Sequence, residues 1–412
     1  MSLLVMKFGG TSLATIDLIK KAAARVEAEV SHGYNVIVIV SAMSEKTNQL
    51  VGWVNDISSM YDAREYDAVV SSGEQVTAGL LALVLQENSI PARSWQGWQV
   101  PLKTVGSHSA ARISEIPTDN LKSKFSEGMK VAVVAGFQGI SSEGRITTLG
   151  RGGSDTTAVA FAAAFNAKRC DIYTDVDGVY TTDPRICDKA RKLNQISFEE
   201  MLEMASLGAK VLQTRSVELA MRFKVKLRVL SSFDEQVTNT GTIVCREEDV
   251  MEKNVVAGVA FSRDEAQMTL LGVNDRPGIA AAIFGPLSVS GINVDMIVQN
   301  ISEDGLTNMT FSCPIDQVAR AQKTISKCKD DGELKFSKLL VDTNVAKVSV
   351  VGIGMRSHAG VAAQMFNALK VENINIKVIS TSEIKISVLI DRKYLELAVH
   401  ALHDDFQLEK SS

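Results

Sequence analysis

The chain has 412 residues, of which 45% are apolar and 22% are charged, a balance typical of a globular protein with two or three domains. The formal net charge is −4, from 44 basic and 48 acidic residues, and no run of Lys or Arg predicts binding to nucleic acid or to an anionic membrane. The apolar part of the opening MSLLVMK is too short for a signal peptide, and no window predicts a membrane span. We therefore expect a cytoplasmic protein with neither a nucleic-acid nor a membrane partner.

The cysteines and histidines give no sign of a metal site. The five cysteines are scattered and lack the spacing of metal ligands, so we expect reduced thiols. The five histidines are also dispersed, which argues against zinc. The cysteines are Cys170, Cys187, Cys245, Cys313 and Cys328.

The first part of the chain alternates strands and helices. Residues 3–8 (LLVMKF) predict a strand, and the helix after it is expected to stop at His32-Gly33. Its apolar stripe consists of Ile16, Ile19, Ala23, Val26 and Val30. Residues 35–42 (NVIVIVSA) form an apolar run typical of a central parallel strand covered on both faces. Further strands are expected in residues 130–137, 170–176 and 224–230. An α/β sandwich with sites at the carboxyl ends of its strands follows.

The rest of the chain contains an internal repeat. Residues 276–297 match residues 358–379 at a fixed offset, and each copy has a strand before it, a helix inside it and strands after it. The polar segment 233–253 is interpreted as the junction between the two parts of the chain. The repeat therefore predicts two small modules of the same fold.

Two glycine-rich turns carry charged residues. In KFGGTS, Lys7 precedes two glycines at a strand end, an arrangement suited to phosphate, although a tight turn with a surface lysine is the alternative. In TLGRGGSDTTA, Arg151 suits a carboxylate, and a helix is expected from about Thr156. Asp155 is either part of the site or the N-cap of that helix.

Two further segments have the composition of a ligand site. In YTDVDGVYTTDPR (173–185), acidic, hydroxyl and Arg side chains follow a strand and suit a nucleotide with Mg²⁺, or form a solvated loop. In SSGEQVTAGLLALVL (71–85), Glu74 lies in the first turn of a predicted helix. That position favours a carboxylate through the helix dipole, and it also suits an ammonium ligand.

Taken in order, these segments resemble those of aspartate kinases, members of the amino-acid kinase superfamily. The resemblance covers essentially the whole chain, and its remaining motifs are SAMSEKTNQL, GFQG and GAKVLQTRS. The paired modules resemble ACT domains, small βαββαβ units that bind amino acids. The resemblance implies an α/β amino-acid kinase sandwich with a mostly parallel central sheet over residues 1–245. Two α+β ACT domains are expected over 246–340, with the junction, and over 341–412.

The resemblance also implies roles for matching residues. Lys7 and Asp155 are expected to be catalytic. Substrate-binding residues are expected to be Ser41, Thr47, Glu74, Phe137, Arg151, Gly152, Gly153 and Ser154. Nucleotide-binding residues are expected to be Lys7, Phe8, Gly9, Gly10, Ser41, Thr174, Asp175, Tyr180, Asp183, Arg185 and Lys210. Many members have His-Pro after GAKVL, where this chain has Gln213-Thr214 and retains Lys210.

The implied reaction is attack by the β-carboxylate of L-aspartate on the γ-phosphoryl group of ATP. It gives 4-phospho-L-aspartate, the first step toward lysine, threonine, methionine and diaminopimelate. A carboxylate is ionised at neutral pH, so no general base is needed, and catalysis is expected from positioning and charge neutralisation. Mg²⁺ is expected to be carried by ATP, with no protein side chain as a direct ligand.

The resemblance further implies feedback by lysine and threonine, with ACT modules of different subunits pairing in a homo-oligomer. A purely structural dimerisation repeat is the alternative. Some relatives make a short subunit from an internal start, and Met251 stands where it would fall. The expected effector residues are Asn274, Asp275, Arg276, Pro277, Gly278, Ile279, Ala280, Asn293, Val294, Asp295, Gln299, Met355, Arg356, His358, Gly360, Val361, Asn375, Ile376, Thr381, Ser382 and Glu383.

Two other functions remain open at this point. One is another kinase of the same superfamily, acting on glutamate, acetylglutamate, carbamate or a nucleoside monophosphate. The other is a catalytically silent amino-acid sensor that kept the fold. Glu74 and Arg151 argue against the first because they provide for both ends of an α-amino acid. The joint presence of Lys7, Arg151 and Asp155 argues against the second.

Overall fold

The computed structural model describes residues 2–207, 211–234, 240–250, 255–301 and 305–410. The chain forms two compact units, and we describe each by itself. The first comprises Met1–Val179, Lys192–Ala205 and Lys210–Glu252, and the second comprises Tyr180–Arg191, Ser206–Ala209 and Lys253–Ser412. The domain limits expected at residues 245 and 340 stay a prediction. The two compact units do not test these limits, because the units are interleaved along the chain.

The first unit is built on a mostly parallel sheet, as predicted. In spatial order its strands are β10 (Gln195–Ser197), β12 (Thr242–Cys245), β11 (Leu227–Ser231), β9 (Cys170–Thr174), β1 (Leu3–Phe8), β2 (Asn35–Val40), β6 (Val131–Ala135) and β3 (Ala92–Trp95). Among these described strands only β11 and β12 pair antiparallel. Strands β1, β2 and β6 are buried along their whole length, which explains their uninterrupted apolar sequences.

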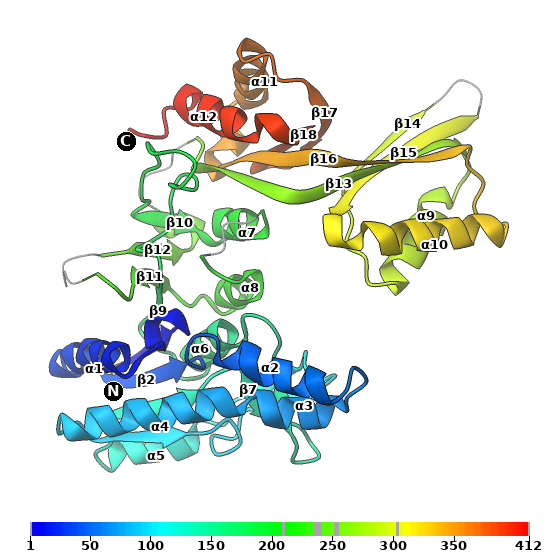
Figure 1. Cartoon of the computed structure of the whole chain (residues 1–412). Coiled ribbons are helices and arrows are strands. Elements are labelled where there is room, and N and C mark those ends of the chain that lie inside the picture. The colour runs from blue at the N-terminus through cyan, green and yellow to red at the C-terminus, as the bar shows by residue number, and fades with distance from the viewer. Residues whose placement is uncertain (1, 208–210, 235–239, 251–254, 302–304, 411–412) are drawn as a thin grey trace. The chain divides into compact units, whose positions relative to one another are not determined.

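Helices cover the sheet on both faces (Figure 1). They are α1 (Ile16–Ser31), α2 (Lys46–Ile57), α3 (Ala63–Val70), α4 (Ser72–Glu87), α5 (Asp119–Ser126), α6 (Gly153–Ala164), α7 (Phe198–Ser206) and α8 (Thr214–Phe223), with 3₁₀ turns at Thr11–Leu13 and Glu247–Asp249. Helices α1 and α4 share one apolar core with β1, β2 and β6, while α6 packs on β1 and against α8. The predicted stop of α1 at His32-Gly33 is confirmed, since His32 is the C-cap and Gly33 has φ +89°.

Two features of this unit were missed in the sequence. Strand β12 lies within the segment that we interpreted as a polar junction. The second is a smaller sheet. Its strand order is β5 (Arg112–Glu115), β4 (Lys103–Val105), β7 (Gln138–Ile140) and β8 (Ile146–Thr148). Its short strands carry no clear alternation, which is why the pattern did not predict them.

The expectation that no window resembles a membrane span does not hold for one helical stretch by length and composition alone. Residues Ala63–Glu87 are long and apolar enough to cross a membrane by length and composition, although half of the apolar window is buried inside the fold. Within the stretch, α4 packs on α1, β3 and β6. A core helix of a globular domain accounts for this composition.

The second unit contains the repeated modules, joined in one sheet. Its strand order is β14 (Asp295–Ile301), β15 (Leu306–Pro314), β13 (Gly258–Asn274), β16 (Lys338–Val351), β18 (Lys385–Asp391) and β17 (Ile376–Thr381). The helices are α9 (Ile279–Val289), α10 (Val318–Asp330), α11 (Val361–Val371) and α12 (Leu395–Asp405), with 3₁₀ turns at Ile315–Gln317, Ile353–Ser357 and Arg392–Tyr394. Helices α9 and α10 pack together in the first module, and α11 and α12 in the second.

The two long strands β13 and β16 run through both modules (Figure 1). The second half of β13 pairs with β15 and with the first half of β16. The first half of β13, residues 258–265, pairs instead with 345–351 of β16, which in turn pairs with β18. The second module is therefore completed by a strand that precedes the first module in the chain.

The segment Tyr180–Arg191 belongs to the second unit although the chain on both sides of it belongs to the first. Thr181 Oγ1 lies 3.0 Å from Nε2 of His403, which is fully buried. Lys189 donates to Asp404 at 2.8 Å. The segment Tyr180–Arg191, from the first half of the chain, therefore packs against α12.

Candidate active site

Lys7 is directed away from the apolar core by strand alternation. Its neighbours Met6 and Phe8 belong to the core shared with α1 and α4, so Lys7 lies on the opposite face of β1, where α6 packs. Its Nζ is 2.6 Å from Oδ1 of Asp155, and both side chains are 11% exposed. The alternative of a tight turn with a surface lysine is therefore wrong.

The N-terminus of α6 provides the other wall of this site. The helix begins at Gly153, earlier than the start expected near Thr156, and its N-cap is Gly152 with φ +72°. Asp155 is therefore not the N-cap, and that interpretation is wrong. A Cβ on Gly152 would lie 2.2 Å from Cγ of Gln213, so glycine is needed for both the backbone conformation and the packing.

The turns after β1 and β2 approach each other closely. A Cβ on Gly10 would lie 2.9 Å from the carbonyl oxygen of Ala42, and Ser44 donates its backbone N–H to the carbonyl of Gly10 at 3.1 Å. Ser41 donates its N–H to the carbonyl of Phe8 at 3.2 Å. The glycine of KFGGTS thus permits close packing of two loops at the carboxyl ends of neighbouring strands.

Glu74 is a buried carboxylate in the first turn of α4, as the sequence predicted. It is 3% exposed, and its Oε1 accepts a hydrogen bond from the backbone N–H of Ala42 at 3.1 Å. Its Oε2 is buried and has no hydrogen-bond partner among the described residues. Burial raises the pKa of Glu74 to about 7. A buried acceptor without a partner indicates a ligand donor.

These elements line an open cavity of about 440 Å³. The residues predicted as site residues that line it are Lys7, Gly10, Ser41, Thr47, Glu74, Phe137, Arg151, Gly152, Gly153, Ser154 and Asp155. The lining residues that the sequence analysis did not assign are Thr11, Ala42, Met43, Ser44, Glu45, Asn48, Gly150 and Gln213. All eight lie inside the quoted motifs, so the motifs themselves contained the signal.

Phe137 has an unusual backbone in this cavity. Its φ is +67°, and its N–H donates to Oγ1 of Thr157 at 3.2 Å while its carbonyl accepts from Leu149 at 2.9 Å. A Cβ on Gly153 would lie 2.8 Å from the Phe137 ring. The GFQG turn is therefore locked against the start of α6, where the sequence placed a substrate contact.

Among the residues that the structure describes, the remaining predicted nucleotide residues do not line the cavity. Phe8 is fully buried, with its ring stacked on Tyr173 at 4.6 Å, and Gly9 donates its N–H to the carbonyl of Tyr173. Thr174 and Asp175 lie at the end of β9, the strand next to β1. Those that belong to the second unit are Tyr180, Asp183 and Arg185. Lys210 lies outside the described residues.

Asp183 and Arg185 form a compact turn. Arg185 donates its backbone N–H to Oδ1 of Asp183 at 2.9 Å, and its guanidinium lies 2.7 Å from Oδ2. Hydrogen bonds from Arg185 hold the pKa of Asp183 below its ordinary value. The Arg185 side chain is 87% exposed.

The structure brings one pair of predicted effector residues together in each module. In the first, Nε2 of Gln299 is 3.5 Å from Oδ1 of Asp275. In the second, Arg356 pairs with Glu383 at 3.3 Å. Gly278 and Gly360 have positive φ and cap α9 and α11 in the same way, which confirms the structural equivalence of the repeats.

Asp295 is tied to the sheet where the two modules meet. It lies 2.9 Å from Nζ of Lys347, which also pairs with Glu265 at 2.8 Å. Burial opposes ionisation of Asp295, but Lys347 overcomes it and holds the pKa of that carboxyl below its ordinary value.

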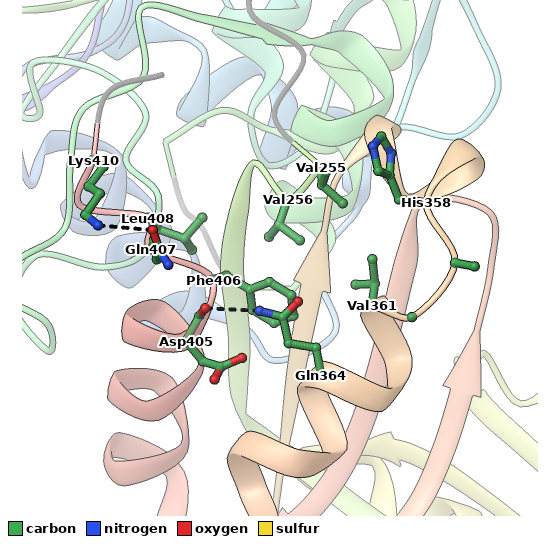
Figure 2. A pocket seen from close by; sticks show the side chains of 12 residues that line it. Val255, Val256, His358, Val361, Gln364, Asp405, Phe406, Gln407, Leu408 and Lys410 are labelled. Atoms are coloured by element: carbon green, nitrogen blue, oxygen red, sulfur yellow. Dashed lines mark hydrogen bonds between the residues drawn. The ribbon is translucent and has the colours of Figure 1, made fainter.

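A second cavity, of about 520 Å³, lies at the N-terminus of α11 (Figure 2). His358, Gly360 and Val361 of the predicted effector set line it. Gln364 closes one side by donating to the carbonyl oxygen of Asp405 at 3.0 Å. The other predicted residues of the second module do not line this cavity.

The mostly parallel sheet, the cavity at its carboxyl edge and the two repeated modules define an amino acid kinase with a regulatory half. A model of the amino acid kinase family matches residues 2–231, and models of the ACT domain match residues 268–330 and 348–406. The chain is 52% identical over 410 residues to an aspartate kinase of Stutzerimonas stutzeri, covering 99% of this chain and 98% of that protein. It is 51% identical to an aspartokinase of Pseudomonas aeruginosa, with the same coverage. The chain belongs to the aspartokinase family.

The architecture also matches solved structures of this family. Escherichia coli aspartokinase III in complex with aspartate and ADP, in its R-state, has a TM-score of 0.80 at 27% identity, covering 98% of this chain and 99% of that chain. The T-state of the same protein, in complex with lysine and aspartate, has a TM-score of 0.77 with the same coverage. The predicted fold class, an amino-acid kinase domain followed by two ACT domains, is confirmed.

Proposed function

We propose that the cavity lined by Lys7, Glu74, Arg151 and Asp155 is where this aspartate kinase transfers the γ-phosphoryl group of ATP to the β-carboxylate of L-aspartate. The observation that carries the proposal is the meeting of these four charged groups, from β1, α4 and the start of α6, in one cavity. Lys7 supplies a cation for phosphate. Glu74 and Arg151 supply groups for the two ends of an α-amino acid in the same cavity.

The chemical problem at this site is repulsion between two anions. The β-carboxylate is already ionised at neutral pH, so the protein has no proton to remove before attack. Lys7 and the backbone N–H groups at the start of α6 offset the negative charge of the phosphoryl group as it moves. Asp155 holds the Lys7 ammonium at this position.

Recognition of aspartate is assigned to the two sides of the cavity. The unpartnered Oε2 of Glu74 accepts from the α-ammonium group, and the guanidinium of Arg151 binds the α-carboxylate. With both ends held, the side-chain carboxylate is left to point toward Lys7. Ser41, Thr47 and Ser154 line the same space and supply hydroxyl groups.

We assign the nucleotide to the adjoining strand end. Thr174 and Asp175 follow β9 beside β1, and Arg185, also expected in the set, belongs to the second unit. Tyr180, Asp183 and Lys210 complete the proposed set. Within the described ranges, no group of three or more His, Cys, Asp or Glu side chains is placed to hold a metal ion. We propose that Mg²⁺ would be carried by ATP, with ligands chiefly from phosphate oxygens and water, and would supply charge neutralisation there.

Feedback inhibition through the ACT modules is the second half of the proposal. We propose lysine and threonine as the effectors, which fits a place at the head of the pathway to lysine, threonine, methionine and diaminopimelate. The repeat and the lysine complex of the E. coli neighbour support it. An effector that prefers one of two states shifts the equilibrium between them.

Pairing of ACT modules between subunits is also proposed. Ile297 on β14 and Ile379 on β17 occupy equivalent positions in the repeat and are 51% and 44% exposed. Apolar side chains on exposed strands at both edges of the sheet suit a subunit contact. A short subunit starting at Met251, which lies outside the described residues, and a cytoplasmic location stay predictions.

The test is an assay with Mg-ATP, hydroxylamine and L-aspartate that follows aspartyl hydroxamate, with glutamate as the acceptor control. We expect aspartate-dependent product that falls when lysine and threonine are added together. Product that ignores both amino acids would remove the regulatory half of the proposal. Absence of hydroxamate with either acceptor would favour a silent amino-acid sensor.

Asp155→Asn tests how Lys7 is held. The variant keeps the size and polarity of the side chain but removes the charge 2.6 Å from Nζ of Lys7. Because Gly152 is the N-cap of α6, the substitution leaves the cap intact. We expect the turnover number to fall by about 10- to 100-fold. This is the usual loss when a catalytic group, here the Lys7 ammonium, is displaced by up to about 1 Å. Steady-state kinetics beside thermal unfolding check this, and an unchanged turnover number would refute the role of Asp155.

A further inference from the structure

A second buried carboxylate lies close to the proposed aspartate site without lining it. Asp67 on α3 is fully buried. Oδ2 of Asp67 accepts from Nδ1 of His108 at 2.6 Å, and Oδ1 accepts from Oγ1 of Thr148 at 2.6 Å. The backbone N–H of Ser109 donates to both oxygens at 3.1 Å. A carboxylate that accepts from this many donors is strongly fixed in place.

The donors to Asp67 belong to the segments that hold the loop of Arg151. Thr148 is the last residue of β8, and Gly150 with φ +76° follows directly before Arg151. A Cβ on Gly150 would lie 3.2 Å from the carbonyl oxygen of Ser109. The segment that donates to Asp67 therefore also packs against the backbone next to Arg151.

Asp67 is joined equally closely to the segment of Glu74. Helix α3 ends at Val70 and α4 begins at Ser72, so Asp67 and Glu74 lie on two consecutive helices with a single residue between them. That residue, Ser71, accepts a hydrogen bond from Nε2 of Gln138 at 2.9 Å, which ties the junction to β7. Asp67 thus connects the element that carries Glu74 to the loop that carries Arg151.

We propose that Asp67 is a positioning residue for substrate recognition, which sets the separation between Glu74 and Arg151 and thereby fits the site to the two ends of L-aspartate. The proposal rests on the roles proposed above for Glu74 and Arg151. Glu74 lies on α4 and Arg151 in the loop before α6, and no described hydrogen bond joins the two side chains. A fixed distance between them therefore needs a third group that is connected to both elements. Asp67 is joined to the segments next to Arg151 by its hydrogen bonds to Ser109 and Thr148. It is joined to Glu74 through the chain, because α4 begins two residues after α3 ends.

The effect of Asp67 should be confined to one substrate. The moving phosphoryl group of ATP is assigned to Lys7 and the start of α6, and the rest of the nucleotide to the end of β9. No described hydrogen bond joins Lys7 or the end of β9 to Asp67. Loosening the Arg151 loop weakens a contact made to aspartate in the ground state and in the transition state alike. Such a change raises KM for aspartate more than it lowers kcat.

The experiment compares two adjacent threonines of β8. Thr148→Val removes the hydroxyl that donates to Asp67, whereas Thr147→Val removes a hydroxyl that pairs with Thr104 at 2.7 Å. Both threonines are buried, so each variant loses one buried hydrogen bond in the same strand. We expect Thr148→Val to raise KM for aspartate by about tenfold or more and to leave KM for ATP within about twofold. Thr147→Val is expected to change neither value.

Further variants distinguish positioning from loss of stability. Thr148→Ser keeps the hydroxyl and is expected to restore KM for aspartate, and Asp67→Asn is expected to raise it as Thr148→Val does. Equal KM values for aspartate in Thr148→Val and Thr147→Val, with an active wild type, would overturn the proposal. So would a parallel rise of both KM values in Thr148→Val. An inactive wild type in the hydroxamate assay would instead refute the proposed function itself.

Discussion

Replacing Lys7 with alanine is expected to lower the turnover number by about 10³-fold, because the variant lacks the one lysine that lines the cavity within the described residues. Neutralising the charge of the phosphoryl group is the main task of this site, so a missing cation cannot be replaced by tighter binding of aspartate. Steady-state hydroxamate kinetics at saturating ATP and aspartate measure the loss. Turnover within about tenfold of the wild type would contradict the role of Lys7.

Lys7→Ala is also expected to lower the stability of the fold, so its effect on stability has to be measured separately from its effect on turnover. Removing Lys7 leaves the carboxylate of Asp155 buried without its partner, and breaking a buried ion pair costs about 3–5 kcal/mol of unfolding free energy. In the double variant Lys7→Ala with Asp155→Asn, the unpaired charge is gone. We expect the double variant to recover most of the thermal stability and none of the turnover. Recovery of turnover would show that Lys7→Ala acts through stability.

Glu74→Gln is expected to raise KM for aspartate by about 100-fold, because a buried charge that binds the α-ammonium is replaced by a neutral amide. The amide oxygen still accepts from the N–H of Ala42, so the local packing of α4 is kept. Glu87→Gln, at the exposed end of the same helix, is the matched control and should leave KM unchanged. An unchanged KM in Glu74→Gln would refute ammonium binding by this carboxylate.

The pH dependence of the wild type follows from the same group. Burial raises the pKa of Glu74 from 4.5 to about 7, so below that pH the carboxyl is protonated and neutral. We expect kcat/KM for aspartate to rise with pH up to about 7 and then to level off. The rise should disappear in Glu74→Gln, and kcat/KM for ATP should not share it.

The sign of the stability effect is opposite to the effect on binding. Because the folded state binds the Glu74 proton more tightly than the unfolded state does, stability is lost as pH rises from 4.5 to about 7. Above pH 7 the ionised carboxylate costs about 3 kcal/mol of unfolding free energy. Glu74→Gln should therefore unfold at a higher temperature than the wild type at pH 8, with a smaller difference at pH 5. Thermal unfolding at the two pH values checks this.

Local patterns in the sequence were sufficient for the elements that carry the site. The strand LLVMKF, the apolar run NVIVIV and the helix stop at His32-Gly33 all lie where the patterns predicted them. These signals are local. A strand buried on both faces, or the end of a helix, is determined by the types of a few consecutive residues. The ordered motifs also placed Glu74 in the first turn of its helix.

What failed in the sequence analysis depended on contacts between distant segments. The N-cap at Gly152 and the ion pair of Asp155 with Lys7 are decided by how α6 packs on β1, which no local pattern records. Gln213 lines the cavity because its side chain lies against Gly152. The polarity of residues 233–253 concealed β12, whose short apolar run pairs with β10 and β11.

The path of β13 and β16 limits how the regulatory half can be rebuilt. Each strand contributes one half to each module, so the boundary between modules runs across two ladders rather than through a linker. A chimera that exchanges the second module alone, from residue 341 onward, would place a foreign strand against residues 258–265 of the host. Transfer of effector specificity between relatives therefore calls for a graft that begins before residue 258 and carries both modules together.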